Sequence, residues 1–368
     1  MTNNTISINA GVLAESLSRI RASIAKRDAL PILTHVMIDV KDTVVTLTGN
    51  NLESQLSIDI PAVSGIAFSV TASAQKLAEI TSHMQDDKDV SLTDTGTCLV
   101  VKQGRSRYKL NTLPASDFPK IDAETLEGSF RVPERDLLAL LHEVEPAMSV
   151  NDVRYYLNGA LLTVNGSEVR TVATDGHRLS LSTINSGHGN VGSRSIILPR
   201  SVVELISRML STGTEDVEIG VSKNHIHLSK SGWSLVGKLI DGQFPSYEKV
   251  IPTSSAEPAT MGRLAFRDLL QRALILAPEK SHGIRLTFDG NLLSVDVKDD
   301  EGEECQDGMP MNYNGPVVDI GVNGRYLLDA LDTLGGDDVR VSLKDSNTAL
   351  LIKGATDSTL CVVMPMRL

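Results

Sequence analysis

The segment Thr174-Asp175-Gly176-His177-Arg178 contains the residue types in this sequence that could do chemistry. Asp175 and His177 could form a proton relay, because a carboxylate can orient an imidazole that moves a proton. A hydrolytic site would also need a nucleophile, and no Ser or Cys elbow such as GxSxG accompanies the pair. Asp-Gly is also an ordinary turn signal. The pattern therefore favours a turn over an enzyme active site, and the enzyme remains the less favoured hypothesis.

Other signatures of catalysis or cofactor binding are missing from the sequence. There is no GxxxxGK[ST] and no GxGxxG after a strand, so no phosphate-binding loop is predicted. His225 and His227 alternate on an expected strand, but no further ligand follows at metal spacing, so we expect surface histidines and no metal. The cysteines Cys98, Cys305 and Cys361 are far apart and odd in number, which favours free thiols. The sequence predicts a binding or scaffold protein without catalytic residues, metal or cofactor.

The elements that must position these residues recur along the chain. FPKI at 118–121 and FPSY at 244–247 lie 126 residues apart, and a strand pattern upstream of each repeats at the same interval. One third of the 368 residues is about 123, so three such units fill the chain. Units of this length can each bury a core, which argues against a solenoid.

Each unit has the same predicted order of elements. A short strand is followed by a helix, alternating strands and a second helix. The first strands are expected at 5–8, 129–132 and 259–262. The helices are expected at 13–27, 74–85, 134–148, 200–211, 263–277 and 323–334. Because the strands alternate polar and apolar residues, each sheet has one buried face. The fold class predicted is α+β, with helices on one side of antiparallel sheets.

The charge is unevenly distributed. A net charge of −11 argues against a chain coated with basic surface. The six predicted helices hold 12 Lys or Arg and 10 Asp or Glu, so they carry +2 while the other residues carry −13. Residues 296–307 hold seven acids and one lysine, whereas 102–109 (KQGRSRYK) is basic. Opposite charges at the two ends of the repeats could steer a head-to-tail contact between chains.

The location of the protein can also be predicted. The N-terminal MTNNTISINAGVLAESL has no basic region followed by an apolar run, so we expect no signal peptide. No stretch approaches the roughly 18 apolar residues of a membrane span. Widely spaced free cysteines are typical of a reducing compartment. We therefore expect a cytoplasmic protein.

Long motifs in this sequence resemble one known family. NDVRYYLNGALL (151–162), RTVATDGHRLS (170–180) and VVMPMRL (362–368) closely resemble the beta subunit of bacterial DNA polymerase III, the sliding clamp family. LPIL (30–33), GRSRY (104–108), TLPASDFP (112–119), FPSY (244–247) and GIRL (283–286) also match. The resemblance covers the whole chain in order.

The resemblance implies three domains of the DNA-clamp fold, at 1–127, 128–256 and 257–368. It implies that two chains join head to tail into a homodimeric ring, whose helices line a hole that encircles duplex DNA without reading its sequence. Such a ring catalyses nothing and needs no cofactor, and it tethers replicative and repair polymerases for processive DNA replication. A clamp loader driven by ATP opens the ring, so ATP belongs to the partner.

The resemblance also implies a cleft between the second and third domains that receives short linear peptides from polymerases, repair factors and the loader. Flexible methionines suit a pocket that accepts many related peptides. The positions that match the cleft are Arg154, Tyr156, Leu157, Thr174, Gly176, His177, Arg178, Leu179, Pro245, Lys249, Val250, Asn323, Tyr326, Val362, Val363, Met364, Pro365 and Met366.

Two further sets of residues follow from the resemblance. The DNA-contacting positions are Arg27, Tyr155, Tyr156 and Arg200, where the aromatic rings could stack on exposed bases. The ring interface is expected to join one set of residues on the first domain to another on the third. These sets are Lys76, Tyr108 and Leu110, and Ile275, Leu276, Asp299, Asp300, Glu301, Glu303 and Glu304.

Some positions depart from the family pattern. Lys249 stands where an arginine is common, and lysine keeps the charge but loses the planar fork. Ser201 and Gln75 replace basic residues of the lining, so we expect weak, salt-sensitive contact with the duplex. These departures leave open a specialised second clamp with its own partners. A nucleic-acid-processing enzyme that uses Asp175 and His177 is the remaining alternative.

Overall fold

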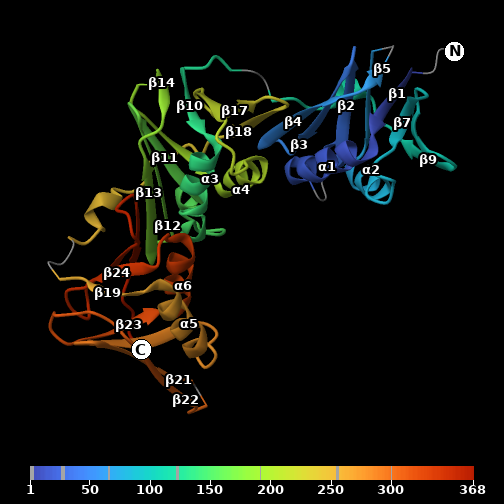
Figure 1. Cartoon of the computed structure of the whole chain (residues 1–368). Helices are drawn as coiled ribbons and strands as arrows, with labels where there is room; N and C mark the ends of the chain where they lie inside the picture. Colours follow the sequence, from blue (N-terminus) through green and yellow to red (C-terminus); the bar gives the residue numbers. More distant parts are fainter. Residues whose placement is uncertain are drawn as a thin grey trace. The chain divides into compact units, whose positions relative to one another are not determined.

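A computed structural model describes residues 4–25, 30–64, 67–121, 124–190, 192–253, 257–299 and 301–368. The chain divides into two compact units, which are described separately (Figure 1). The first comprises Met1–Glu134, Gly189–Val191 and Glu204–Leu239, and the second comprises Arg135–His188, Gly192–Val203 and Ile240–Leu368. Every strand pairing among the described residues is antiparallel, as the alternating sequence pattern predicted.

The first unit holds two sheets. The five-stranded sheet has the order β5 (Val63–Ser64), β1 (Asn4–Asn9), β7 (Asp89–Asp94), β8 (Cys98–Gln103) and β9 (Ser106–Asn111). The nine-stranded sheet has the order β14 (His188–Asn190), β10 (Gly128–Pro133), β16 (Asp216–Val221), β17 (His225–Lys230), β18 (Trp233–Lys238), β4 (Ser54–Pro61), β3 (Val44–Asn50), β2 (His35–Lys41) and β6 (Phe68–Ser73).

The second unit also holds two sheets. The eight-stranded sheet has the order β15 (Arg194–Pro199), β11 (Gly159–Asn165), β12 (Glu168–Thr174), β13 (Arg178–Ile184), β26 (Thr359–Val363), β25 (Leu350–Lys353), β24 (Asp338–Ser342) and β19 (Ala259–Gly262). The four-stranded sheet has the order β22 (Glu304–Pro310), β21 (Leu292–Lys298), β20 (Gly283–Asp289) and β23 (Val318–Asn323).

Two of these sheets are each built from two sequence repeats. In the nine-stranded sheet β18 pairs with β4, with Trp233 opposite Ile58. In the eight-stranded sheet β26 pairs with β13, with Val362 opposite Leu179. In both cases the last strand of one repeat, β18 or β26, pairs with a strand of the repeat before it. That strand, β4 or β13, is the third strand after the first helix of its repeat. Neighbouring repeats are therefore joined by continuous backbone hydrogen bonding.

The six predicted helices are present but shorter than expected. They are α1 (Ala10–Ile20), α2 (Ala74–Thr81), α3 (Glu134–His142), α4 (Arg200–Met209), α5 (Arg263–Ala273) and α6 (Gly324–Thr333). The first begins at Ala10 rather than residue 13, because the Asn9 side chain caps it by accepting a hydrogen bond from the amide of Val12 at 3.0 Å. The third helix ends at His142 rather than at residue 148. Pro146 follows in a short 3-10 helix, Glu145–Ala147, and proline is not tolerated in the interior of an α-helix.

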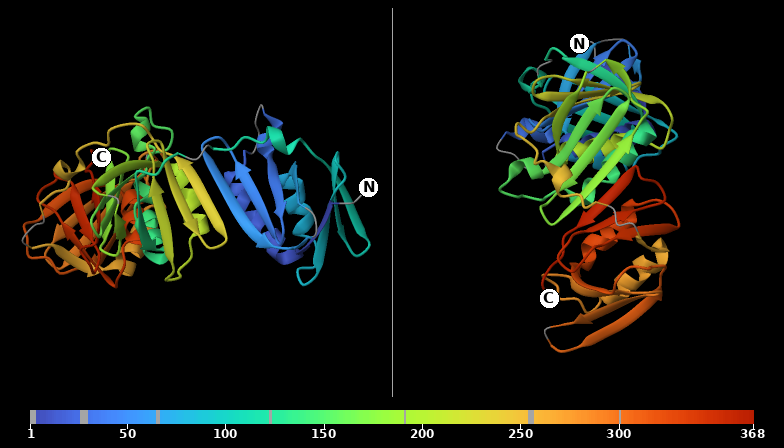
Figure 2. Two further views of the ribbon diagram at one scale, coloured as in Figure 1. Left: turned by 90° about the horizontal axis from the view of Figure 1, so that it is seen from above. Right: turned by 90° about the vertical axis from the view of Figure 1, so that its left-hand side faces the viewer.

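The helices cover sheet faces within each unit. In the first unit α1 packs on α2 and against β3 and β4, and the blue helices of Figure 2 lie beside the blue strands. In the second unit α5 packs on α6, with α5 against β21 and β22 and α6 against β26. None of the helices in the described ranges is long and apolar enough to cross a membrane.

The cores are mostly aliphatic, as expected for a chain with 4% aromatic residues. The core around α5 and α6 in the second unit adds Phe266 and an edge-to-face pair of Phe288 and Tyr313, with ring centres 6.1 Å apart. His225 is a buried residue rather than a surface histidine, and its Nδ1 lies 3.2 Å from a carboxylate oxygen of Glu124. The strand β17 is covered on that face, which its alternation alone did not show.

Candidate functional site: the surface around β13, β26 and helix α6

The turn between β12 and β13 is built by Asp175. Its Oδ1 accepts hydrogen bonds from the amides of His177 at 2.9 Å and Arg178 at 3.0 Å, and its Oδ2 accepts one from Arg178 Nε at 3.0 Å. Gly176 has φ +90°, a conformation that favours glycine. The Asp175 carboxylate is thus committed to the turn and to Arg178, so the geometry favours the turn over a relay with His177.

Arg154 reaches this turn from the loop before β11. Its side chain forms a two-pronged ion pair with Asp152, with Nε–Oδ1 at 3.0 Å and Nη2–Oδ2 at 2.7 Å. These hydrogen bonds lower the pKa of the Asp152 carboxyl to about 2. Arg154 Nη2 also donates to the carbonyl oxygen of Asp175 at 3.1 Å. A Cβ at Gly176 would lie 3.0 Å from Arg154 Nη1, so a side chain there would press on the arginine and require it to shift.

Arg178 links the turn to helix α6. Its Nη1 donates to Asp329 Oδ2 at 2.5 Å, and its guanidinium carbon lies 4.3 Å from the ring centre of Tyr326. Burial raises the pKa of the Tyr326 hydroxyl. Asn323 caps the same helix by accepting hydrogen bonds from the amides of Arg325 and Tyr326. Strand β13 and helix α6 therefore present one polar and aromatic surface.

The floor beside this surface is apolar. Leu157, Leu179 and Val362 are each no more than 2% exposed, and Leu179 and Val362 belong to one cluster on one face of the sheet. Val363, which the sequence also assigned to the cleft, packs in the core on the opposite face, because successive strand residues alternate. The floor is thus formed by every second residue of β13 and β26.

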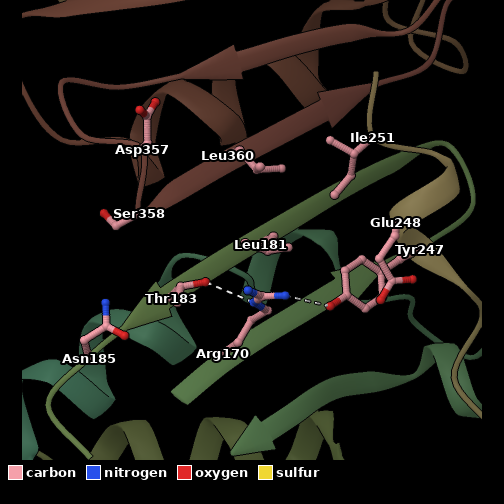
Figure 3. Close-up of a pocket in the computed structure, with 10 residues that line it drawn as sticks. All are labelled: Arg170, Leu181, Thr183, Asn185, Tyr247, Glu248, Ile251, Asp357, Ser358 and Leu360. Carbon is pink, nitrogen blue, oxygen red and sulfur yellow. Dashed lines mark hydrogen bonds between the residues drawn. The ribbon is translucent and has the colours of Figure 1, made fainter. Parts of the chain in front are cut away.

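The FPSY segment crosses this sheet face. Tyr247 is buried in the same cluster as Leu179 and Val362, while Pro245, Lys249 and Val250 are exposed. Beside Tyr247 lies a cavity of ≈ 490 Å³ (Figure 3), lined by Arg170, Leu181, Thr183, Asn185, Tyr247, Glu248, Ile251, Asp357, Ser358 and Leu360. Arg170 donates to Thr183 Oγ1 at 3.2 Å and to the Tyr247 hydroxyl at 3.4 Å across its floor.

The C-terminal tail brings the methionines to the turn. The amide of Met364 donates to the carbonyl oxygen of His177 at 2.9 Å. Met364 is 38% exposed, and Pro365 and Met366 are half-buried. Contacts around the turn thus join Arg154, Arg178, Tyr326 and Met364, and Thr174 donates across the turn to the carbonyl oxygen of Arg178.

The residues assigned to DNA are placed differently from one another. Tyr155 is 56% exposed and forms an edge-to-face pair with the half-buried Tyr156, with ring centres 5.7 Å apart. Arg200 Nη2 donates to the carbonyl oxygens of Glu145 and Met148 at 3.2 and 3.0 Å. Arg27 lies outside the described residues.

The described residues assigned to the ring interface range from exposed to buried. Tyr108 is 41% exposed and Leu110 is buried, both on β9. Lys76, together with His35 and Lys109, lines a cavity of ≈ 270 Å³ beside this strand, and burial with the nearby Lys76 charge lowers the pKa of His35.

The second set lies near β22. Ile275 is 78% exposed, whereas Leu276 packs against the core. Asp299 Oδ1 accepts hydrogen bonds from the amides of Glu301 and Glu303 and so shapes the acidic turn. Glu304 forms an ion pair with Lys298 at 2.8 Å. Asp300 lies outside the described residues.

Sequence reasoning missed several residues that hold this surface. Asp152 precedes Arg154 by two residues, and this spacing could have indicated the ion pair. Asp329 meets Arg178 from 151 residues away, and no local pattern reveals such a contact.

Comparisons with known proteins cover the whole chain. Family models of the DNA polymerase III beta subunit match its N-terminal domain at residues 4–122, its central domain at 131–246 and its C-terminal domain at 248–367. The beta sliding clamp of Pseudomonas aeruginosa is 35% identical over 366 residues, covering 98% of this chain and 99% of that protein. The beta sliding clamp of Escherichia coli K12 is 34% identical, covering 97% and 98%.

Solved structures of sliding clamps also match this chain. A DnaN sliding clamp from Pseudomonas aeruginosa bound to griselimycin has a TM-score of 0.96 at 34% identity, with both chains fully covered. A C. crescentus beta sliding clamp, solved with PEG bound to a putative beta-motif tethering region, has a TM-score of 0.93 at 29% identity, with both chains fully covered. These matches confirm the predicted clamp fold and the non-catalytic function of a DNA sliding clamp, and the chain belongs to the DNA polymerase III beta subunit family.

Proposed function

We propose that two copies of this chain close head to tail into a ring around duplex DNA, with three domains per chain at 1–127, 128–256 and 257–368. The pattern of strand pairing between repeats supports this proposal most directly. The last strand of the second repeat, β18, pairs with β4, and the last strand of the third, β26, pairs with β13. The equivalent strands that remain are β9, the last of the first repeat, and β22, the third after α5.

Both remaining strands are free to pair with another chain. Among the described strands, β9 and β22 each end a sheet. An edge strand offers unpaired backbone groups, so β9 of one copy can add to β22 of the next in the way that β18 adds to β4. We call this pairing of β9 with β22 of another copy the joint. If the joint forms twice between two copies, the assembly is closed and leaves neither β9 nor β22 unpaired.

Charge and exposure support this joint. The hairpin of β8 and β9 carries Lys102, Arg105, Arg107 and Lys109. The turn before β22 carries Glu301 and Glu303, and β22 itself begins with Glu304. Complementary charges steer two surfaces into one register. Ile275, 78% exposed, would lose its contact with water in the joint.

We also propose that the cleft surface binds short linear peptides of polymerases, repair factors and the clamp loader. Its apolar floor of Leu157, Leu179 and Val362 suits a buried apolar side chain, and Arg154 and Arg178 stand at its polar end. DNA contact is proposed through Tyr155, Tyr156 and Arg200, and through Arg27, which lies outside the described residues. A cytoplasmic location stays a prediction from the free cysteines.

The cleft is tested with a synthetic peptide of the C-terminal segment of the replicative polymerase from the same organism. Deleting residues 364–368 should abolish its binding and leave the dimer intact, because the tail carries Met364 and Met366 but touches neither β9 nor β22 in strand pairing. Unchanged peptide affinity in the deletion variant would place the binding site elsewhere.

A further inference from the structure

The C-terminal tail, residues 364–368, leaves the eight-stranded sheet and runs beside the four-stranded one. After β26 the amide of Met364 donates to His177, and the amide of Met366 donates to the carbonyl oxygen of Gly321 at 2.8 Å. Gly321 lies on β23, which ends the four-stranded sheet. The tail therefore adds one backbone hydrogen bond to an edge strand.

The tail lies against Gly321 more closely than any side chain would allow. A Cβ atom at this position would lie 2.6 Å from the carbonyl oxygen of Met366 and 2.8 Å from Cγ of Leu368. The first of these is a backbone atom, which cannot rotate away as a side chain can. A methyl group at residue 321 must therefore displace the tail backbone or strand β23.

A second glycine lies under the end of the tail but is less demanding. A Cβ at Gly283 would lie 2.6 Å from Cδ2 of Leu368 and 3.5 Å from Cε of Met366. Both are the ends of flexible side chains, which can adopt other rotamers. A side chain at residue 321 would thus collide with the tail backbone, whereas a side chain at residue 283 would collide only with movable side chains.

Among the described residues, parts of the tail have few surroundings to hold them. Leu368 is 58% exposed and Met364 is 38% exposed. A cavity of ≈ 390 Å³ lies beside the tail, bounded also by Arg285, Ser346 and Asn347, so packed side chains do not fill that space. A segment with few buried contacts has low local stability, and losing one close contact can shift its position.

We propose that Gly321 is a positioning residue of the partner cleft. By having no side chain, it lets the tail lie on β23 and so holds Met364 and Met366 where they face a bound peptide. The proposal rests on the proposed peptide-binding function, because it assigns the tail's placement to that site. Gly321 does not touch the peptide itself.

The test compares Gly321→Ala with two other glycine variants of the full chain. Amide hydrogen exchange at Met366 reports the tail, and the polymerase peptide reports the cleft. Gly321→Ala should speed exchange at Met366 and weaken peptide binding at least about fivefold, as overpacking predicts. Gly283→Ala should change both much less. Gly262→Ala should change neither, because a Cβ there meets only Ala265 Cβ at 3.8 Å. Dimer mass should stay unchanged in all three.

A further variant guards against misfolding of Gly321→Ala. Leu368→Ala weakens the same docking without adding an atom to β23, and it should also speed exchange at Met366 and weaken peptide binding. Wild-type exchange and affinity in both variants would overturn the role of Gly321 while leaving the cleft intact. If the wild-type chain bound no peptide, both the proposed peptide-binding function and this role of Gly321 would be rejected.

Discussion

The guanidinium carbon of Arg178 lies 4.3 Å from the centre of the Tyr326 ring. Arg178 belongs to β13 and Tyr326 to α6, so this contact ties a strand from the middle of the chain to a helix near its end. The same arginine bonds Asp175 and Asp329. One side chain therefore sets the relative position of the turn and the helix that border the cleft.

Arg178→Lys should weaken both stability and peptide binding. Lysine keeps the charge but cannot bond Asp175 and Asp329 in two directions while lying flat on Tyr326. The loss is expected to be about 1–3 kcal/mol in the free energy of unfolding, from lost charged hydrogen bonds. Chemical denaturation measures it. Tyr326→Phe is the control, since it keeps the ring face, and equal losses in the two variants would argue against this role of the guanidinium.

Gly176→Ala should damage the cleft more than Gly166→Ala does. Both glycines have positive φ, +90° and +64°, so either substitution should strain the backbone by roughly 1–2 kcal/mol. Only at Gly176 would the new methyl meet Arg154, whereas nothing lies within 4 Å at Gly166. Peptide affinity should fall in Gly176→Ala alone. An equal fall in both variants would show that backbone strain, rather than Arg154, is responsible.

Glu134→Gln should destabilise the protein more than Glu215→Gln does. Both carboxylates lie 2.8 Å from Lys230 Nζ, but the side chain of Glu134 is 3% exposed and that of Glu215 is 74% exposed. Glu134 also accepts hydrogen bonds from the amide and hydroxyl of Ser211. We expect the free energy of unfolding to fall by about 1–3 kcal/mol in Glu134→Gln and by less than about 1 kcal/mol in Glu215→Gln. Equal effects would contradict the importance of burial.

The Glu134 effect should depend on pH. Burial opposes its ionisation, but the hydrogen bonds from Lys230 and Ser211 outweigh burial and lower its pKa below 4.5. A carboxyl with a lowered pKa in the folded state stabilises above its unfolded pKa, and this stabilisation is lost as pH falls through the folded value. The difference between wild type and Glu134→Gln in urea unfolding should be full at neutral pH and shrink below about pH 4.5. A constant difference would refute the assignment.

Ile275→Glu should convert the proposed dimer into a monomer. A charge at this exposed apolar position would be buried without a partner in the joint and meet the nearby acids. Sedimentation of the variant at several concentrations measures the change. Val317→Glu, at a residue 64% exposed in the same domain, should leave the mass unchanged. Dissociation in both variants would mean that added charge alone separates the chains.

The sequence predicted the repeated elements, because alternation in strands and the spacing of apolar residues in helices are local signals. The clamp fold was predicted from the resemblance of its motifs to the sliding clamp family. Helix ends were less predictable, as α3 shows by stopping before Pro146. Val363 was assigned to the cleft by its neighbours in the motif, although strand alternation turns it into the core. Gly321 had no sequence signal at all, since its role arises where a tail 45 residues later passes over it.

The mass of the protein in solution tests the central claim, a ring closed by β9 and β22, most directly. Sedimentation equilibrium at micromolar concentration should give twice the mass of the chain, with dissociation promoted by salt because opposite charges face each other across the joint. A strict monomer under these conditions would contradict a ring that two copies of this chain close by themselves.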